Sequence, residues 1–493
     1  MTTTLNRIET DVPGLDELLN GGLVVGRLYL VVGHPGTGKT LLGMEFLRTG
    51  LESGETTLFV HGEESKSEIL ANAREFGIDL EGTEFLDLGP DSDFFSGDRT
   101  YDLVDTRDLE SDTFIEDIRE AIERINPDRI LLDPISQLQY LEPTEYQFRR
   151  RLISFMRFLK GRGTTVIATK TPEHSRSDNE VRSLSDGIIE LEQNEFERRV
   201  TVQKHRGIGQ RDGSHGLKIS ADGMEVYPSL LPERSAESFG PELIASGIDE
   251  LDSLLAGGLE RGTATFISGP TGVGKTTTGT QFLAEAAERG DNPVAYLFEE
   301  SPKTFVHRSE SLGIPITKLQ KENSLRLEPV EPLALSAEEF AQGALEQVER
   351  NGSKVLMVDG VDGYKVAMQG DENELGRKLH ALIRTLKNRD VAVLLLDETE
   401  RVTGMPTATS ANISYIADNI LFLNYIEMDG ELRKVIGVLK KRSGDFERTL
   451  REFDIGSDGI SVGDPLTGVQ GILEGTPRIV DSDADSAGQS AER

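Results

Sequence analysis

One short pattern occurs twice in the chain, as GHPGTGKT (33–40) and GPTGVGKT (269–276). Each copy follows a run of aliphatic residues typical of a buried strand and precedes a helical pattern. Glycines at these spacings let backbone N–H groups close around phosphate oxygens, and the following helix adds a favourable dipole. The chain is therefore expected to build a strand, a phosphate-binding loop and a helix twice.

Matching blocks surround the two loops, which begin 236 residues apart, at Gly33 and Gly269. The order of the blocks is the same in both halves, so we infer an internal duplication. The matched pairs are 13–33 with 246–269, 59–65 with 296–301, 129–136 with 354–362, 184–191 with 416–423, and 203–207 with 439–444.

The domain boundaries follow from this duplication and from composition. We predict a first ATPase domain over 1–232 and a second over 233–475, joined by a Pro/Ser/Glu-rich linker within 227–242. Residues 476–493 are small, polar and acidic, which predicts a disordered tail.

The fold class expected for each domain is α/β. Short strand-like runs alternate with helical patterns, which predicts a mostly parallel sheet flanked by helices. Apolar residues recur at helical spacing at Phe148, Leu152, Phe155 and Leu159. A β-hairpin pattern closes each domain, clearest where Asp429-Gly430 supplies the turn.

The two loops predict that both domains bind a nucleoside triphosphate with Mg²⁺. Lys39 and Lys275 are expected to contact the β- and γ-phosphates, and Thr40 and Thr276 to place a hydroxyl on the metal. The alternative, an ordinary glycine-rich turn, does not explain two copies in the same context. The predicted nucleotide-binding residues are Gly33, Gly36, Thr37, Gly38, Lys39 and Thr40 in the first loop, and Gly269, Gly272, Val273, Gly274, Lys275 and Thr276 in the second.

Carboxylates follow the strands that come after each loop. Asp133 and Asp359 each end an apolar run, where a carboxylate can reach the magnesium shell. The pairs Glu63-Glu64 and Glu299-Glu300 end the second strand of each domain. There a carboxylate can take a proton from a water or a hydroxyl, and a neighbouring like charge raises its pKa. The alternatives are a turn aspartate and a solvated acidic surface.

Two cations stand late in each domain, at Lys204 and Arg206 and at Lys440 and Arg442. Alternate residues of a strand face the same way, so each pair is expected to project together. An isolated subunit offers them no phosphate. In a ring they would reach a neighbour's nucleotide, and the alternative is an ordinary basic edge strand. The basic cluster between Arg149 and Arg162 is expected to be a solvated face or a subunit contact.

Composition limits the possible functions. The chain has no cysteine, which excludes disulfides and thiolate metal sites, and its net charge of −33 repels nucleic acid and anionic membranes at long range. Adaptation to high salt is the favoured explanation of the charge, and an acidic interaction surface is the alternative. Without a signal peptide or an apolar run long enough to span a bilayer, the expected location is the cytoplasm.

The combination of tandem loops, Glu-Glu-Ser segments and Lys-x-Arg pairs resembles KaiC, the circadian-clock ATPase family of the RecA superfamily. The resemblance runs from about Asn6 to Ile479 and, with the acidic charge, points to a haloarchaeal type of member. It implies RecA-like folds, a double-ring homohexamer with ATP between subunits, and a regulatory protein partner that stays unidentified. It also implies that Glu63 and Glu64 serve hydrolysis and that Glu299 is the base for phosphoryl transfer.

The same resemblance implies autophosphorylation in the second domain. Ser414 falls on the family's serine acceptor and Thr409 on a nearby secondary site, but Tyr415 replaces the threonine acceptor. Pro134 and Gly360, which follow the magnesium aspartates, also depart from the family's usual serine. The alternative for Ser414 is an ordinary polar residue before a strand.

The function expected is an ATP-hydrolysing regulatory protein with autokinase activity on Ser414. Two other classes stay open at this point. One is a nucleic-acid-dependent ATPase of the RecA or DnaB type, which the acidic charge and the lack of interleaved basic and aromatic residues disfavour. The other is a non-hydrolysing ATP-bound scaffold, which the intact glutamate pairs disfavour.

Overall fold

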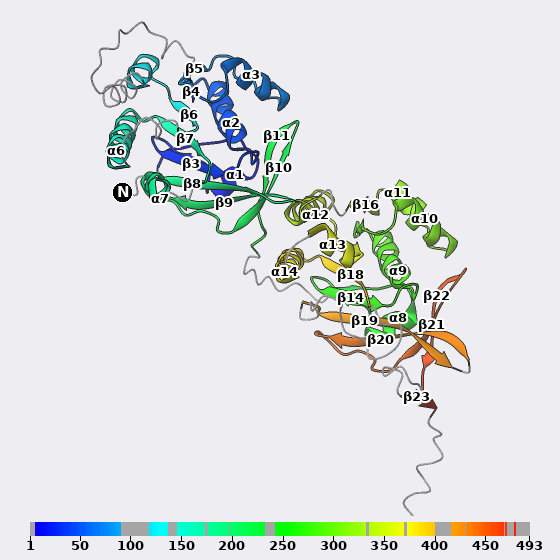
Figure 1. Cartoon of the computed structure of the whole chain (residues 1–493). Coiled ribbons are helices and arrows are strands. Elements are labelled where there is room, and N and C mark those ends of the chain that lie inside the picture. Colours follow the sequence, from blue (N-terminus) through cyan, green and yellow to red (C-terminus); the bar gives the residue numbers. More distant parts are fainter. Residues whose placement is uncertain are drawn as a thin grey trace, which may run out of the picture. The chain divides into compact units, whose positions relative to one another are not determined.

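The structure is a computed structural model that describes residues 5–89, 118–136, 145–172, 176–195, 197–231, 242–331, 335–368, 372–399, 416–428, 430–467, 469–470 and 478–479. The chain forms two compact units, Met1–Ser229 and Leu230–Arg493 (Figure 1). The boundary between them in the sequence, after Ser229, falls within the segment 227–242, where a linker is expected. The two units are described separately below.

The first unit contains a nine-stranded sheet with the order β11-β10-β9-β8-β3-β7-β6-β4-β5. The strands from β5 to β8 run parallel, and β9, β10 and β11 continue the sheet antiparallel. The strand bounds are β3 Leu28–Gly33, β4 Thr57–His61, β5 Glu84–Asp87, β6 Arg129–Asp133, β7 Thr165–Lys170, β8 Gly187–Gln193, β9 Arg198–His205, β10 Ser214–Ser220 and β11 Gly223–Tyr227.

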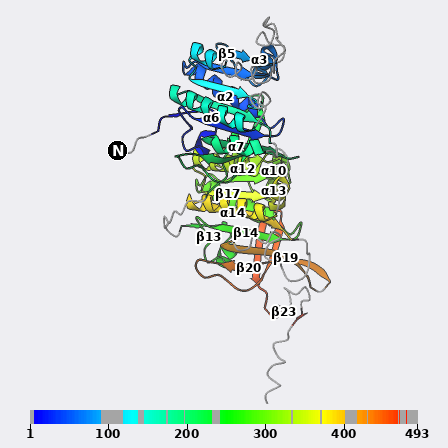
Figure 2. The ribbon, with the colours of Figure 1, turned by 60° about the vertical axis from the view of Figure 1, so that its left-hand side comes forward.

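Helices cover both faces of this sheet because its central strand is apolar on both sides. In β3, Tyr29 and Val31 pack into the core under α2 (Lys39–Glu52), while Leu30 and Val32 pack into the core under α6 (Glu145–Arg162). The helical stripe predicted on α6 is buried at Leu152, Phe155 and Leu159. Figures 1 and 2 show these two helices on opposite faces of the sheet. Other helices among the described residues of the unit are α1 Leu15–Leu18, α3 Lys66–Glu75 and α7 Arg176–Leu184, and residues 118–125 are helical as well.

The second unit repeats this topology strand for strand. Its nine-stranded sheet has the order β16-β15-β17-β18-β14-β19-β20-β21-β22. The strand bounds are β14 Ala264–Gly269, β15 Val294–Leu297, β16 Arg326–Pro329, β17 Val355–Asp359, β18 Ala392–Glu398, β19 Asn419–Met428, β20 Glu431–Lys441, β21 Arg451–Gly456 and β22 Gly459–Pro465. The helices are α8 Asp249–Leu254, α9 Lys275–Glu288, α10 Pro302–Ser311, α11 Ile316–Lys321, α12 Ala337–Asn351, α13 Val361–Met368 and α14 Glu372–Asn388.

Each sheet ends in an antiparallel extension, as the fold class predicted. The expected hairpin of the second unit is β19–β20, and a second hairpin, β21–β22, lies beyond it. The first unit has the same pair, β8–β9 and β10–β11. The predicted α/β class, with two tandem units that each have a mostly parallel sheet, flanking helices and a C-terminal hairpin, is therefore confirmed.

Three two-stranded sheets stand beside the main sheets. They are β1 (Arg7–Ile8) with β2 (Leu23–Val24), β12 (Leu243–Ile244) with β13 (Leu259–Glu260), and β23 (Val469–Gln470) with β24 (Arg478–Ile479). The predicted tail lies outside the described residues apart from 478–479. Within the part of the chain that is described, no helix is both long and apolar enough to cross a bilayer.

Candidate nucleotide sites

Both glycine-rich loops join the central strand of a sheet to a helix, β3 to α2 and β14 to α9. The helices begin after Gly38 and Gly274, which have φ of 102° and 119°, a region that disfavours side chains. A Cβ on Gly38 would lie 2.6 Å from Ile219 Cδ1, and one on Gly274 would lie 2.4 Å from Ile455 Cδ1. The last glycine of each loop is therefore pressed against the hairpin that ends its own sheet.

Neither helix has a side-chain cap at its N-terminus among the described residues, although α3, α10 and α12 begin with serine caps. The first N–H groups of α2 and α9 are thus left for another acceptor, and they favour an anion. Lys39 Nζ donates to His34 O at 3.0 Å, and Lys275 Nζ donates to Gly269 O at 2.9 Å and to Pro270 O at 3.1 Å. Burial lowers the pKa of both lysines, and nearby carboxylates oppose that change.

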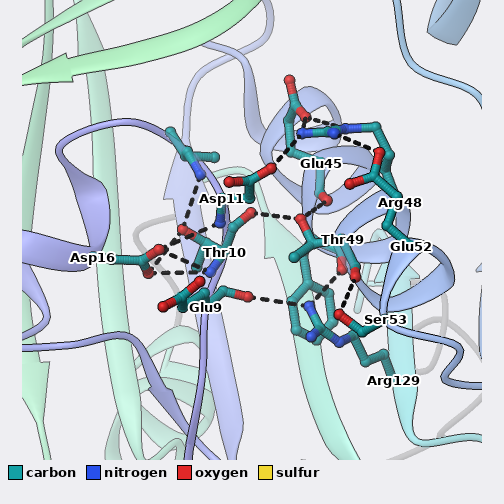
Figure 3. Close-up of polar contacts among 12 residues, drawn as sticks. Glu9, Thr10, Asp11, Asp16, Glu45, Arg48, Thr49, Glu52, Ser53 and Arg129 are labelled. Atoms are coloured by element: carbon teal, nitrogen blue, oxygen red, sulfur yellow. Dashed lines mark hydrogen bonds and ion pairs between the residues drawn. The ribbon is translucent and has the colours of Figure 1, made fainter.

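A polar network fixes the helix behind the first loop (Figure 3). Thr49 on α2 donates its hydroxyl to Thr10 O at 3.0 Å, and Asp16 accepts from the Thr10 hydroxyl at 2.9 Å. Arg129, 2% exposed, forms an ion pair with Glu55 and donates to two backbone carbonyl oxygens, Phe46 O at 2.9 Å and Glu9 O at 3.2 Å. The N-terminal segment, α2 and β6 are thereby held together.

In the second unit, a cavity of about 330 Å³ opens beside the loop. It brings together residues that are far apart in the sequence. Among its lining residues are the predicted Gly272, Gly274, Lys275, Thr276, Glu299 and Asp359, together with Thr271, Arg308, Gly360, Glu398 and Lys434. The phosphate loop, the glutamate expected to act as base and the aspartate expected to reach magnesium therefore share one space.

The two aspartates are the last residues of equivalent strands, Asp133 of β6 and Asp359 of β17. Asp359 accepts from the Thr276 hydroxyl at 3.2 Å, and burial raises the pKa of Asp359 to about 7. Asp133 instead accepts a hydrogen bond from the Thr169 hydroxyl on β7, and Leu396 stands at the matching position of β18. The first unit thus holds its aspartate by a strand residue, and the second holds it by the loop itself.

The glutamate pairs follow β4 and β15. Burial raises the pKa of Glu299 and of Glu300, and Glu398 adds a further repulsion at Glu299. Glu300 forms an ion pair with Arg308 at 2.7 Å, whereas Glu64 accepts from Asn72 Nδ2 at 3.2 Å. A carboxyl with a raised pKa beside the phosphate loop is suited to accept a proton.

The serines after the glutamate pairs have a structural role. Ser65 caps α3 by accepting from Glu68 N, and Ser301 caps α10 by accepting from Thr304 N. A helix must begin there for the pair to face the loop, so a serine recurs in both units for helix capping.

The Lys-x-Arg pairs lie at the other end of the sheets. Lys440 pairs with Ile420 next to Phe266, near the start of β14, and Lys204 holds the equivalent place beside Ile188. The phosphate loops follow the C-terminal ends of β3 and β14, so the Lys-x-Arg pairs and the loops lie at opposite ends of the strands. Each pair is therefore remote from the nucleotide site of its own unit.

These cations contact residues of their own unit. Lys204 Nζ and Arg206 Nη2 both donate to Ser183 O, at 3.1 Å and 2.9 Å, at the end of α7. Arg442 lies 3.3 Å from Asp418 and its side chain is 53% exposed. About half of the Arg442 side chain is thus exposed to solvent.

The remaining predicted loop residues lie in the two phosphate loops themselves. Gly33, Gly36 and Thr37 belong to the first loop, Thr40 lies in the first turn of α2, and Val273 of the second loop is fully buried. In the basic cluster of α6, Lys160 forms an ion pair with Asp186 at 2.8 Å and Arg162 one with Glu123 at 3.4 Å. Ser414, Thr409 and Tyr415 lie outside the described residues.

Sequence reasoning missed three charged residues of the cavity. Glu398 ends β18 and accepts from the Thr271 hydroxyl at 3.2 Å, a position that the strand-end argument applied to Asp359 would have found. Lys434 reaches the cavity only through the register of the β19–β20 hairpin. Arg308 stands eight residues after Glu300, and the only signal for it was a comparison with the other unit.

The residues present fit Mg²⁺ and ATP. Uncapped helix N-termini and a half-buried lysine suit phosphates, and the hydroxyl of Thr276 beside the carboxylate of Asp359 offers the oxygen ligands that Mg²⁺ prefers. When bound, ATP supplies the phosphoryl group and Mg²⁺ offsets its charge.

Comparison with known proteins decides the family. The family described as "ATPase: KaiC" matches residues 8–230 and again 244–467. The chain belongs to the KaiC family of ATPases. The resemblance read from the motifs is therefore confirmed, and KaiC-family membership covers both nucleotide sites.

Circadian clock proteins of the KaiC family match this chain over nearly its whole length. A circadian clock protein KaiC3 of Synechocystis sp. is 28% identical over 498 residues, which cover 97% of this chain and 95% of the relative. A circadian clock oscillator protein KaiC of Picosynechococcus sp. is 28% identical, with 98% and 94% covered. A protein of the same description from Synechococcus elongatus is 28% identical, with 97% and 93% covered.

Proposed function

We propose that the protein is an ATP-hydrolysing regulatory protein that assembles into a double-ring homohexamer, with Mg²⁺ and ATP held at the interfaces between subunits. The ATPase activity follows from the family. The ring, the interfacial sites and the regulatory role are the proposal, as is a regulatory protein partner.

The observation that carries the proposal is the separation of two charged sets within each unit. Lys275, Glu299 and Asp359 gather at the C-terminal ends of the parallel strands of the second sheet. Lys440 and Arg442 lie toward the opposite ends of these strands. A ring of identical subunits brings these ends together, so that the cations of one subunit meet the phosphates bound by the next.

Within each site, we assign hydrolysis to the glutamates. Glu299 lines the cavity, and its raised pKa makes it a stronger base for taking a proton from an attacking water. In the first unit Glu63 lies close enough to Lys39 to oppose the lowering of the lysine pKa. Glu64 and Glu300 hold neighbouring polar side chains and support this geometry.

Autophosphorylation of Ser414, with Thr409 as a secondary acceptor, is part of the proposal and rests on the resemblance. If Glu299 takes the proton of a serine hydroxyl, the oxygen attacks the terminal phosphoryl group and ADP leaves. Incubation with Mg²⁺ and ATP followed by phosphopeptide mapping tests this. Phosphate found solely outside 405–418 overturns the assignment of Ser414.

The ATPase and assembly proposals are tested together. Sedimentation and phosphate release are measured with Mg²⁺ and ATP at low and high salt, for the parent and for the variant Glu63→Gln/Glu64→Gln. We expect slower hydrolysis with an unchanged sedimentation coefficient. Turnover as fast as the parent in this variant and in Glu299→Gln/Glu300→Gln would show that the catalytic assignment is wrong.

A further inference from the structure

Arg308 of the second unit stands where the first unit has an asparagine. In each unit, a helix capped by serine follows the glutamate pair, α3 after Ser65 and α10 after Ser301. Counted from these caps, Arg308 occupies the position of Asn72 in the first unit. The two sites are therefore chemically different on the helix that faces the phosphate loop.

Arg308 is held in place from two sides. Its Nη2 lies 2.7 Å from Glu300 Oε1, and its Cζ lies 5.3 Å from the ring centre of Phe305, a side chain with no exposed surface. The Arg308 side chain is 34% exposed. An arginine fixed by an acid and an aromatic ring presents its remaining N–H groups at small entropic cost.

The guanidinium belongs to the nucleotide cavity. Arg308 lines that cavity with Lys275, Glu299 and Asp359, and its charge lowers the pKa of Asp359 against the effect of burial. Among the described residues, Arg308 Nε is buried without a hydrogen-bond partner. A buried donor in that state is stabilised by an incoming acceptor.

We infer that Arg308 binds the terminal phosphate of a nucleoside triphosphate in the second site and makes that site prefer ATP to ADP. The inference rests on the proposed function, in which this cavity holds Mg²⁺ and ATP. Guanidinium has five donors in a planar fork, so Arg308 keeps Glu300 and still contacts a phosphate oxygen. The shorter, neutral Asn72 offers the first site no equivalent charge.

A purely structural role predicts something different. If Arg308 served solely to neutralise Glu300, its removal would disturb the cavity as a whole. The affinities for ATP and for ADP would then fall by the same factor. The ratio of the two affinities separates a phosphate contact from this role.

The test uses the full chain with the first loop disabled by Lys39→Ala. Affinities for ATP and ADP with Mg²⁺ are measured by calorimetry before and after adding Arg308→Asn, which places the first unit's residue in the second. Loss of one charge-assisted hydrogen bond should lower the affinity for ATP about 10- to 100-fold. The affinity for ADP should change less than about threefold. Arg350→Asn, at a side chain that is 74% exposed on α12, is the matched control and should change neither.

The inference is overturned if the affinities for ATP and ADP fall by the same factor, or if neither affinity changes. Because Arg308→Asn leaves Glu300 unpaired, Glu300→Gln/Arg308→Asn is measured as well, and recovery of the ATP preference there would also overturn it. Lys275→Ala in the Lys39→Ala background tests the proposed function separately. If that variant still bound ATP as tightly as its parent, the cavity would not be the nucleotide site.

Discussion

Gly360 and Glu299 share one corner of the second site: a Cβ atom on Gly360 would lie 2.8 Å from Glu299 Oε1. Gly360 has φ of 102°, which side chains rarely adopt. The residue after Asp359 is thus a glycine because the glutamate occupies the space of a side chain.

Gly360→Ser should displace the Glu299 carboxylate and slow hydrolysis at the second site about 100-fold, the lower end of the range contributed by a positioned base. Phosphate release is measured in the Lys39→Ala background. Gly343→Ser, which adds a side chain where nothing lies within 4 Å, is the control. Similar rates for the two variants would contradict the prediction.

The second site should bind Mg²⁺ and ATP more tightly as the pH rises. The pKa of Asp359 is raised to about 7, so at lower pH a proton must be released before the carboxylate can face a cation. From pH 6 to pH 8 the affinity should rise about tenfold. The first site, measured in Lys275→Ala, corrects for titration of ATP itself. Identical pH profiles for the two sites would rule out this role of Asp359.

The raised pKa of Asp359 also predicts how the stability of the second unit changes with pH. A carboxyl whose pKa is raised on folding stabilises the fold at acid pH and loses that contribution as the pH rises. Without nucleotide and Mg²⁺, the second unit should lose stability between about pH 4 and pH 7. Urea unfolding at several pH values measures this, and Asp359→Asn should flatten the dependence.

Arg129→Met should destabilise the first unit by about 2–3 kcal/mol, because it leaves Glu55 and two carbonyl oxygens without their donor. Glu55 is 28% exposed and regains water, which limits the cost. The free energy of unfolding is measured in denaturant. Arg350→Met removes an exposed ion pair on α12 and should cost less than about 0.5 kcal/mol.

Mixing two inactive variants tests whether Arg442 acts on a neighbour. Glu299→Gln chains keep the cation and Arg442→Ala chains keep the base, so mixed rings should recover activity at interfaces that combine the two. Arg433→Ala, near the start of β20, the strand that ends just before Arg442, should remain active when unmixed. A mixture no more active than the average of its components would place Arg442 outside the neighbouring site.

Much of the fold could be predicted from the sequence because its signals are local. The loops, the strands before them and the stripe on α6 depend on residues close in the chain. The pairing of Lys440 with Ile420, and with it the end of the strands at which the Lys-x-Arg pair lies, depends on the register of a hairpin. Arg308 and Lys434 depend on tertiary packing, which no spacing encodes.

The serine after each glutamate pair shows what a recurring motif can mean in physical terms. It is part of the pattern that resembles KaiC, and in the structure Ser65 and Ser301 each cap a helix. Repetition in a duplicated chain preserves structural residues as well as chemical ones.

The contacts of Gly38 with Ile219 and of Gly274 with Ile455 couple each phosphate loop to the hairpin that ends its sheet. In the first unit that hairpin ends at Tyr227, two residues before the unit boundary at Ser229. Because packed protein interiors leave little empty space, each phosphate loop and the hairpin it touches form one packed body. In the first unit that packed body extends from the phosphate loop to within two residues of the unit boundary.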